Sequence, residues 1–449
     1  MTGVVWFRRD LRHSDNPAWS AATRNHDQVR ALFVLDPRLW RTAGSHRGPQ
    51  LAAHLRALDD QLAVGGGRLR VVAGPPEVVV PAEAADAAAV YWNADYTPYA
   101  RRRDALAGDS LGVPVHQLDG SVVHPPGSLV TGAGRPFRVF TPFYRRWREL
   151  PLELGPGPGR AAVDSDPGDG VPATPPPLLA GGEVAAQRRL EMFLDRVDRY
   201  SDDRDRPDLD GTSRLSVDLK FGTLSPAAVV AAVGDATPGR EAFTRQLAWR
   251  DFYTEVLANH PETVRGALRP EYDAIAWQND PESLAAWQDG LTGYPIIDAG
   301  MRQLAREGWM HGRVRMLAAS FLVKDLLIDW RLGERHFRRL LLDGDVAQNV
   351  GNWQWVAGTG TDAAPYFRVF NPVTQSLKFD PAGDYIRRYV PELAGLSDQA
   401  IHAPWELGPL ELAAARVTLG VDYPYPIVDH AEARRHAIAA YEKARGDAT

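Results

Sequence analysis

The chain has 449 residues, 44% of them hydrophobic and 24% charged, a composition typical of a soluble globular protein and a length that predicts two domains. Its formal net charge of −6 argues against a protein that coats nucleic acid nonspecifically, although a local basic patch is compatible with this value. The absence of cysteine excludes disulfides, cysteine-ligated iron–sulfur clusters and thiolate nucleophiles.

The first part of the chain alternates short apolar runs with stretches of helical spacing. The apolar runs are Val4–Phe7, Ala31–Leu35, Leu69–Val72 and Ala89–Trp92. This alternation predicts a Rossmann-like parallel α/β sheet, whose ligands bind beyond the carboxyl ends of the strands, where Asp95 lies. No GxGxxG follows the first run, so the dinucleotide fingerprint is absent. The first run is too short for a signal peptide or membrane span, and we expect a cytoplasmic protein.

Proline and glycine cluster between Thr131 and about Gly182, which predicts a long surface linker. We therefore expect an α/β domain at residues 1–130, a linker at 131–185 and an all-α domain at 186–449. Residues 137–148 interleave arginines with aromatic rings. This pattern can hold a nucleic acid, but a helix that packs its rings inward is the commoner explanation.

Two segments of the predicted helical domain carry an unusual polar pattern. The sequence GTSRLS at residues 211–216 combines a glycine, hydroxyls and an arginine, which suits a pyrophosphate, although such residues are usually helix caps. Gln246, Trp249, Arg250 and Tyr253 recur at i, i+3, i+4 and i+7, so they share one helical face. A face that packs in a core would be aliphatic.

The stretch DGDVAQNVGNWQW at residues 343–355 is the strongest candidate for a functional helix. If it is helical, Asp345, Asn349 and Trp353 share one stripe at i, i+4 and i+8. Trp355 lies about 200° further around the helix from Trp353, so the two indoles point nearly opposite ways. One of these two indoles can therefore contact a redox cofactor while the other contacts a substrate. The alternative is an amphipathic core helix with a polar stripe, at the cost of buried polar groups.

Four segments together resemble the DNA photolyase and cryptochrome family, and most closely its class I cyclobutane pyrimidine dimer photolyases. They are VVWFRRDLRHSDNPAW (4–19), DGTSRLSVDLKFGTLSP (210–226), TGYPIIDAGMRQLAREGWMHGRVRM (292–316) and GNWQWVAGTGTDAAPYFRVFNPVTQS (351–376). The similarity extends over essentially the whole chain. It implies an N-terminal α/β antenna domain, a linker, and a helical domain that encloses FAD.

The resemblance implies a role for each matching residue. The residues that match FAD contacts are Tyr200, Thr212, Ser213, Arg214, Leu215, Ser216, Gln246, Trp249, Arg250, Tyr253, Asp343, Gly344, Asp345 and Asn349. Asn349 matches the residue that faces flavin N5, where an amide can accept or donate a hydrogen bond and an aspartate would impose a charge. Trp353, Trp330 and Trp277 match a path that carries electrons between the flavin and the surface.

The same resemblance implies a DNA contact surface. Trp249 and Trp355 match rings that stack on the lesion, and the other matching positions are Gln246, Arg250, Gly312, Arg313, Met316, Arg368, Gln375 and Lys378. Two of these depart from well-known bacterial photolyases, because Gln246 replaces a glutamate and Gly312 an asparagine. The (6-4) photolyases carry histidines at the positions of Gly312 and Met316, and their absence here disfavours that lesion.

The activity implied by the resemblance is light-driven splitting of pyrimidine dimers in UV-damaged DNA by excited reduced FAD, without any metal. The alternative is a cryptochrome-like photoreceptor with weak or no repair activity. The sequence from Trp92 to Asp104 resembles versions that bind 8-hydroxy-5-deazaflavin as an antenna, with Asp95 as its contact, more than versions that bind methenyltetrahydrofolate. We expect a monomer that has no contact with membranes.

Overall fold

The computed structural model describes residues 1–446, which form two compact units. The sheet unit consists of residues 1–201, 213–261 and 342–347. The helical unit consists of residues 202–212, 262–341 and the chain from Gln348 onward. Within residues 1–446, no helix is long and apolar enough to span a bilayer.

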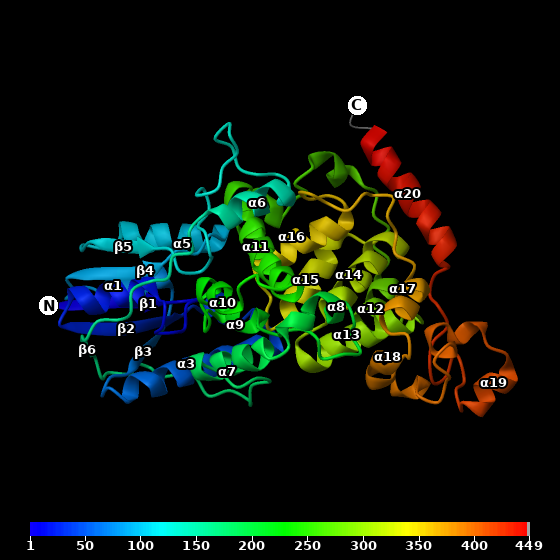
Figure 1. Ribbon diagram of the computed structural model, residues 1–449, viewed down its shortest axis with the longest axis horizontal. Coiled ribbons are helices and arrows are strands. Elements are labelled where there is room, and N and C mark those ends of the chain that lie inside the picture. Colours follow the sequence, from blue (N-terminus) through cyan, green and yellow to red (C-terminus); the bar gives the residue numbers. More distant parts are fainter. Residues whose placement is uncertain (447–449) are drawn as a thin grey trace. The chain divides into compact units, whose positions relative to one another are not determined.

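The sheet unit contains the predicted parallel sheet (Figure 1). Its strands, in the spatial order β3-β2-β1-β4-β5, are β1 (Thr2–Phe7), β2 (Gln28–Leu35), β3 (Leu69–Ala73), β4 (Ala89–Asn93) and β5 (Val115–Leu118), and a short β6 (Ala162–Val163) also pairs with β2. All these pairings are parallel. Because the strand order reverses direction between β1 and β4, a crevice is expected beyond their carboxyl ends.

The sheet is buried on both faces because successive side chains of each strand point to opposite sides. Val5 and Phe7 of β1 join a core with the helices α1 (Pro17–Asn25) and α3 (Gly44–Ala63). Val4 and Trp6 face the other way, toward α4 (Pro76–Glu83) and α5 (Pro98–Asp109). Burial on both sides explains the continuous apolar runs within β1, β2 and β4. The predicted α/β class is therefore confirmed.

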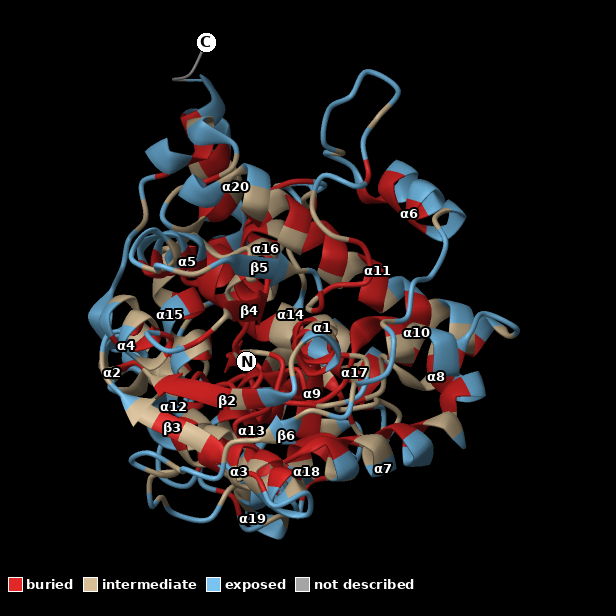
Figure 2. Cartoon of the chain, turned by 90° about the vertical axis from the view of Figure 1, so that its left-hand side faces the viewer, coloured by how far each residue is buried: buried red, intermediate tan, exposed pale blue. Residues whose placement is uncertain are grey.

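The sheet unit contains further helices. They are α2 (Pro37–Trp40), α6 (Phe140–Glu149), α7 (Glu183–Leu194), α8 (Tyr200–Asp203), α9 (Ser216–Phe221), α10 (Pro226–Val233) and α11 (Pro238–Asn259). The last two residues of α8 are part of the helical unit. In α6, Phe143 packs on Phe252 of α11 at 5.2 Å between ring centroids, while Arg145 and Arg146 are exposed. Figure 2 shows these buried and exposed sides of α6. The interleaved arginines and rings therefore reflect helix packing.

The helical unit confirms the predicted all-α class. Its α-helices are α12 (Pro281–Asp289), α13 (Pro295–Glu307), α14 (Gly312–Ser320), α15 (Trp330–Leu340), α16 (Val346–Ala357), α17 (Pro372–Phe379), α18 (Asp384–Tyr389), α19 (Pro409–Ala414) and α20 (His430–Gly446), and a π-helical turn, η4 (Phe321–Asp325), follows α14. N-cap side chains mark the beginning of several of these helices. The Asn371 side chain accepts a hydrogen bond from the Thr374 amide at the start of α17, which has proline at its first position.

The functional helix predicted at residues 343–355 begins later than expected. α16 starts at Val346, so Asp343 and Asp345 lie in the preceding loop, where both are buried. Asn349 and Trp353 do lie four residues apart on one side of α16, and both are buried. The predicted stripe is thus split into a loop carboxylate and a helical amide and indole.

His54 in α3 makes the stability of the sheet unit sensitive to acid. Its ring is fully buried, its Nδ1 accepts a hydrogen bond from the Gly182 amide at 3.0 Å, and burial lowers its pKa to about 3. In the unfolded chain the imidazole takes up a proton below its ordinary pKa of 6.5. The contribution of His54 to stability is therefore complete above that value and lost as the pH falls, by about 1.4 kcal/mol per unit.

We expect the free energy of unfolding to fall by about 2 kcal/mol between pH 7 and pH 5 through this residue alone. His54→Gln, which cannot titrate, is expected to be less stable at pH 7 but to lose less stability on acidification. Urea unfolding of both proteins at the two pH values measures the difference. Equal losses would rule out His54 as the source.

Candidate functional site

Asn349 is held in a single orientation by a neighbouring helix of the helical unit. Its Nδ2 donates to the Glu334 backbone oxygen at 3.0 Å and to the Glu334 Oε1 at 2.9 Å. Since both hydrogens of the amide are used, its Oδ1 is directed elsewhere and can accept a hydrogen bond, as a protonated flavin N5 requires. Glu334 was not predicted from the sequence. Its signal is that Trp330, Glu334 and Arg338 share one face of α15 at i, i+4 and i+8.

Removing the Glu334 carboxylate is expected to disturb both stability and flavin binding. In Glu334→Leu one hydrogen of the buried Asn349 amide loses its acceptor, which costs about 1–3 kcal/mol of unfolding free energy. The released amide can also rotate, so we expect weaker FAD binding. Urea unfolding and the fluorescence of released FAD measure the two effects. Glu334→Gln keeps an oxygen acceptor and is the control, and equal behaviour of the two variants would contradict this role.

The three tryptophans of the implied electron path all lie in the helical unit. Trp353 and Trp330 are buried, and Trp277 is half-buried with its ring 6.1 Å from that of Tyr441. A Cβ on Gly333 would lie only 2.2 Å from Cη2 of Trp353, so α15 approaches α16 closely at this glycine. Trp330 is three residues before Gly333 and lies on the same side of α15. Their use as an electron path stays a prediction.

The predicted phosphate-binding turn combines a left-handed backbone with a local hydrogen bond between an amide and a hydroxyl. Arg214 has a left-handed backbone with φ 53°, and the Leu215 amide donates to the Ser213 hydroxyl at 3.3 Å. α9 begins at Ser216 without a side-chain cap, so no capping side chain accepts from its first amides. Binding of the FAD phosphates here stays a prediction. The Leu215 side chain lies in the core, so it can serve a ligand only through its backbone. Tyr200 also lies in the sheet unit, and Thr212 in the helical unit.

A pocket opens at the carboxyl edge of the sheet, next to the ends of β1 and β4. It has about 480 Å³ of empty space, part of it open to solvent, and is lined by Arg8, Arg9, Asp10, Asn93, Ala94, Asp95, Tyr96, Thr97, Ser121, Val122, Arg250, Thr254, Leu257, Asp345 and Ala347. The sequence assigned Asp95 to an antenna and Asp345 and Arg250 to the FAD site. The structure brings all three into one pocket.

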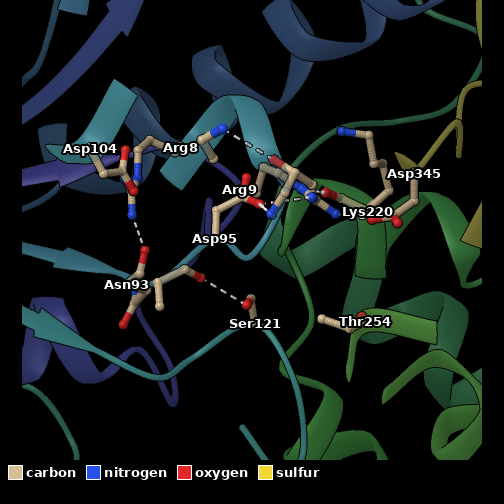
Figure 3. Close-up of polar contacts among 12 residues, drawn as sticks. Arg8, Arg9, Asn93, Asp95, Asp104, Ser121, Lys220, Thr254 and Asp345 are labelled. Atoms are coloured by element: carbon tan, nitrogen blue, oxygen red, sulfur yellow. Dashed lines mark hydrogen bonds and ion pairs between the residues drawn. The ribbon is translucent and has the colours of Figure 1, made fainter. Parts of the chain in front are cut away.

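Arg9 connects Asp95 and Asp345, two of the three aspartates that line this pocket, as Figure 3 shows. Its guanidinium forms ion pairs with Asp345 and, at 3.6 Å, with Asp95. Lys220 lies in the same cluster, where burial and the charge of Arg9 lower its pKa to about 7. Arg250 donates to the carbonyl oxygen of Ser121 at 2.6 Å. Arg9 lies two residues after the end of β1, and its partners, 86 and 336 residues away in the sequence, could not be identified from the sequence pattern.

On α11, the predicted Trp249 is already stacked on one ring of the protein. Its indole lies 3.7 Å from the Phe140 ring with an interplanar angle of 9°, and Tyr253 lies at 5.3 Å. Gln246 donates to the Ala242 carbonyl oxygen at 3.3 Å. Trp249 is nevertheless half-buried rather than buried. Phe140 therefore fixes the indole while leaving part of it accessible.

Four of the predicted DNA contacts converge in one groove of the helical unit. This groove has about 800 Å³ of empty space and is lined by Asp202, Asp205, Arg206, Arg313, Arg368, Gln375, Lys378 and Phe379. The predicted contacts Gly312, Met316 and Trp355 do not line it. Gly312 is exposed, and Met316 and Trp355 are half-buried. Guanidinium, ammonium and amide groups in one groove are the donors that phosphate oxygens need.

Two family models and several curated proteins match this chain. Residues 3–159 match the family described as DNA photolyase, and residues 243–443 match the FAD binding domain of DNA photolyase. The chain is 46% identical to the deoxyribodipyrimidine photo-lyase of Streptomyces griseus over 99% of both chains.

Two solved structures share the fold over nearly the full length. A class III photolyase from Agrobacterium tumefaciens has a TM-score of 0.93 at 38% identity, covering 99% of this chain and 98% of the other. An archaeal photolyase from Sulfolobus tokodaii with two FAD molecules has a TM-score of 0.87 at 35% identity, covering 99% and 100%. Since sequence and fold match along the whole chain, this protein belongs to the DNA photolyase and cryptochrome family.

Proposed function

We propose that this protein is a deoxyribodipyrimidine photo-lyase, which splits cyclobutane pyrimidine dimers in UV-damaged DNA under light and acts as a cytoplasmic monomer. The observation that carries the proposal is the groove of the helical unit, in which Arg313, Arg368, Gln375 and Lys378 converge. A photoreceptor that signals through a protein partner needs no such set of hydrogen-bond donors for DNA. The family membership and the relatives named above support the same activity.

The residues of the chain would bind and orient FAD and the dimer, and FAD, when bound, would be the light-absorbing electron donor. The hydroxyls and amides at residues 213–216 suit its phosphates, and the Oδ1 of Asn349 suits the proton at N5. Trp249 and Trp355 each offer an indole for stacking, which contributes about 1–3 kcal/mol per base. Extrusion of a dimer costs less than that of normal bases because its stacking and pairing are already weakened.

For the antenna we propose 8-hydroxy-5-deazaflavin in the pocket at the carboxyl edge of the sheet. The pocket lies at the reversal of strand order, where such folds bind ligands. The charges of Arg8, Arg9 and Arg250 are balanced by those of Asp10, Asp95 and Asp345, which suits a polar fused ring better than a highly charged ligand. The absorption and mass spectra of protein purified from a deazaflavin-producing host test this. A folate band, or a second flavin such as the Sulfolobus tokodaii protein contains, would contradict it.

A thymine-dimer oligonucleotide tests the repair activity directly. With chemically reduced FAD, we expect the dimer to disappear under blue light and to persist in the dark, as followed by chromatography. A (6-4) photoproduct is expected to remain, because Gly312 and Met316 replace the histidines of the (6-4) enzymes. Dimer DNA that is bound but never repaired would favour the photoreceptor.

Gly312 offers a way to improve lesion binding. It begins α14 and is exposed, and a Cβ at this position would meet nothing within 4 Å. Gly312→Asn is therefore expected to fold normally and to restore a side chain that can hydrogen-bond a pyrimidine edge. We expect about a fivefold gain in affinity for dimer DNA, the effect of one net hydrogen bond.

Fluorescence anisotropy with dimer and undamaged duplexes measures this gain. Gly132→Asn is the matched control, because Gly132 is also exposed with open space around its Cβ but lies in a loop of the sheet unit. The same change in both variants, or a gain on undamaged DNA alone, would contradict a contact with the lesion.

A further inference from the structure

One cation of the groove is already bound by a carboxylate of the protein. The Nη2 of Arg313 lies 2.8 Å from the Oδ2 of Asp205, and the Nε of Arg204 lies 3.9 Å from its Oδ1. The Arg313 side chain is 17% exposed and that of Asp205 is 39% exposed. A carboxylate thus lies between two guanidinium groups at a place that solvent can reach.

Arg313 is fixed by a second contact besides Asp205. Its guanidinium carbon lies 4.5 Å from the centre of the Phe379 ring, so the group rests on an aromatic face. Its buried Nε has no hydrogen-bond partner within residues 1–446. Asp205 therefore holds one edge of the guanidinium and Phe379 supports one face of it, while its Nε–H still lacks an acceptor among these residues. Such an arginine is oriented before any ligand arrives.

A carboxylate and a phosphate compete for the same edge of a guanidinium, because both accept hydrogen bonds from it in the same geometry. Asp205 therefore occupies the position that a DNA phosphate would take on Arg313. Of the other cations in the groove, Arg206 is also paired, with Asp208. The groove thus presents less free positive charge to a duplex than its arginines suggest.

We propose that Asp205 is a specificity-determining residue, which withholds Arg313 from the backbone phosphates of undamaged DNA. To contact a phosphate, Arg313 must give up Asp205, and an undamaged duplex offers nothing further in return. In the complex with a dimer, Arg313 contacts the lesion from the position in which Asp205 and Phe379 hold it. This proposal rests on the proposed function and explains how the enzyme limits its binding to the excess of intact DNA.

Asp205→Asn tests the proposal, because the amide keeps the shape of the side chain but not its charge. We expect the Kd for undamaged duplex to fall about three- to tenfold, and its salt dependence to steepen by about 0.9, the slope for one additional phosphate contact. The Kd for dimer DNA is expected to change less than about twofold, so the ratio of the two constants falls. Asp205→Glu keeps the charge and is expected to behave like the original protein.

Asp398→Asn is the matched control for the loss of one negative charge. Asp398 forms a 2.9 Å ion pair with Arg387 in the same unit but lies outside the groove. It is expected to leave both constants unchanged. In the double variant Asp205→Asn/Arg313→Met, the tightening on undamaged DNA is expected to vanish, because the released guanidinium is missing. Thermal unfolding confirms that each variant is folded.

The proposal is overturned if Asp205→Asn weakens both DNAs or leaves undamaged DNA unaffected, since Asp205 would then only position Arg313. It is also overturned if Asp398→Asn has the same effect, because net charge would then suffice. Failure of the proposed function looks different: the original protein would show no preference for dimer DNA and no light-dependent repair. Whether or not the protein repairs dimers, the Kd values of the original protein and of Asp205→Asn for undamaged duplex show whether Asp205 competes with phosphate for Arg313.

Discussion

Replacing Trp249 by alanine is expected to weaken binding of dimer DNA by roughly 5- to 150-fold, the equivalent of the 1–3 kcal/mol that stacking on an aromatic ring contributes per base. The indole is suited to this role because Phe140 stacks on it at 3.7 Å and fixes its plane. An indole that is already oriented loses little conformational entropy when a base stacks on it. Electrophoretic mobility shift with dimer and undamaged duplexes measures the change.

The expected loss is specific to the lesion, because undamaged DNA keeps its bases in the stack. Trp249→Phe retains a ring and is expected to recover most of the affinity. Trp40→Ala is the control for removal of a half-buried indole, since Trp40 lies in α2 and outside the predicted DNA contacts. Equal losses for both DNAs in Trp249→Ala would mean that the substitution disturbs α11 and α6 rather than a base-stacking surface.

Hydrophobic periodicity was sufficient for the fold because it reports local geometry. The apolar runs around Val5, Leu32 and Val90 are strands, since residues buried on both faces of a sheet must be apolar in succession. The polar stripes on α11 and α16 were likewise visible as departures from a core pattern. Residues that belong to one helix share a side of it as predicted, as Asn349 and Trp353 do on α16.

Hydrophobic periodicity did not reveal the hydrogen-bond and ion-pair partners of the site residues that lie far away in the sequence. Glu334 orients Asn349 from another helix, Arg9 binds Asp345 from the end of β1, and Asp205 binds Arg313 from a loop. A spacing rule places a side chain on a face but does not name what lies opposite. Asp345 shows the consequence, because the predicted helix assigned it to the stripe of Asn349, whereas it lies in a loop bound to Arg9.

Replacing Trp330 by phenylalanine is expected to slow the light-driven reduction of bound FAD by an external donor at least about tenfold, a barrier increase of about 1.4 kcal/mol. Phenylalanine fills much of the same buried space but is far harder to oxidise than an indole. The position is suited to an intermediate carrier because Trp330 is buried and lies on the side of α15 that meets Trp353 at Gly333. Bleaching of the flavin absorption band under blue light measures the rate.

Trp287→Phe provides a matched control for this substitution. Trp287 is also fully buried, its ring lies 6.2 Å from that of Trp353, and its Nε1 donates to the Ala318 carbonyl oxygen at 3.0 Å, but it lies outside the predicted path. We expect Trp287→Phe to keep the original rate. Both variants are expected to repair dimers normally once FAD is chemically reduced, because the path delivers electrons to the flavin and takes no part in binding DNA. An equal slowing in both variants would mean that general packing around Trp353, rather than a route through Trp330, controls electron delivery.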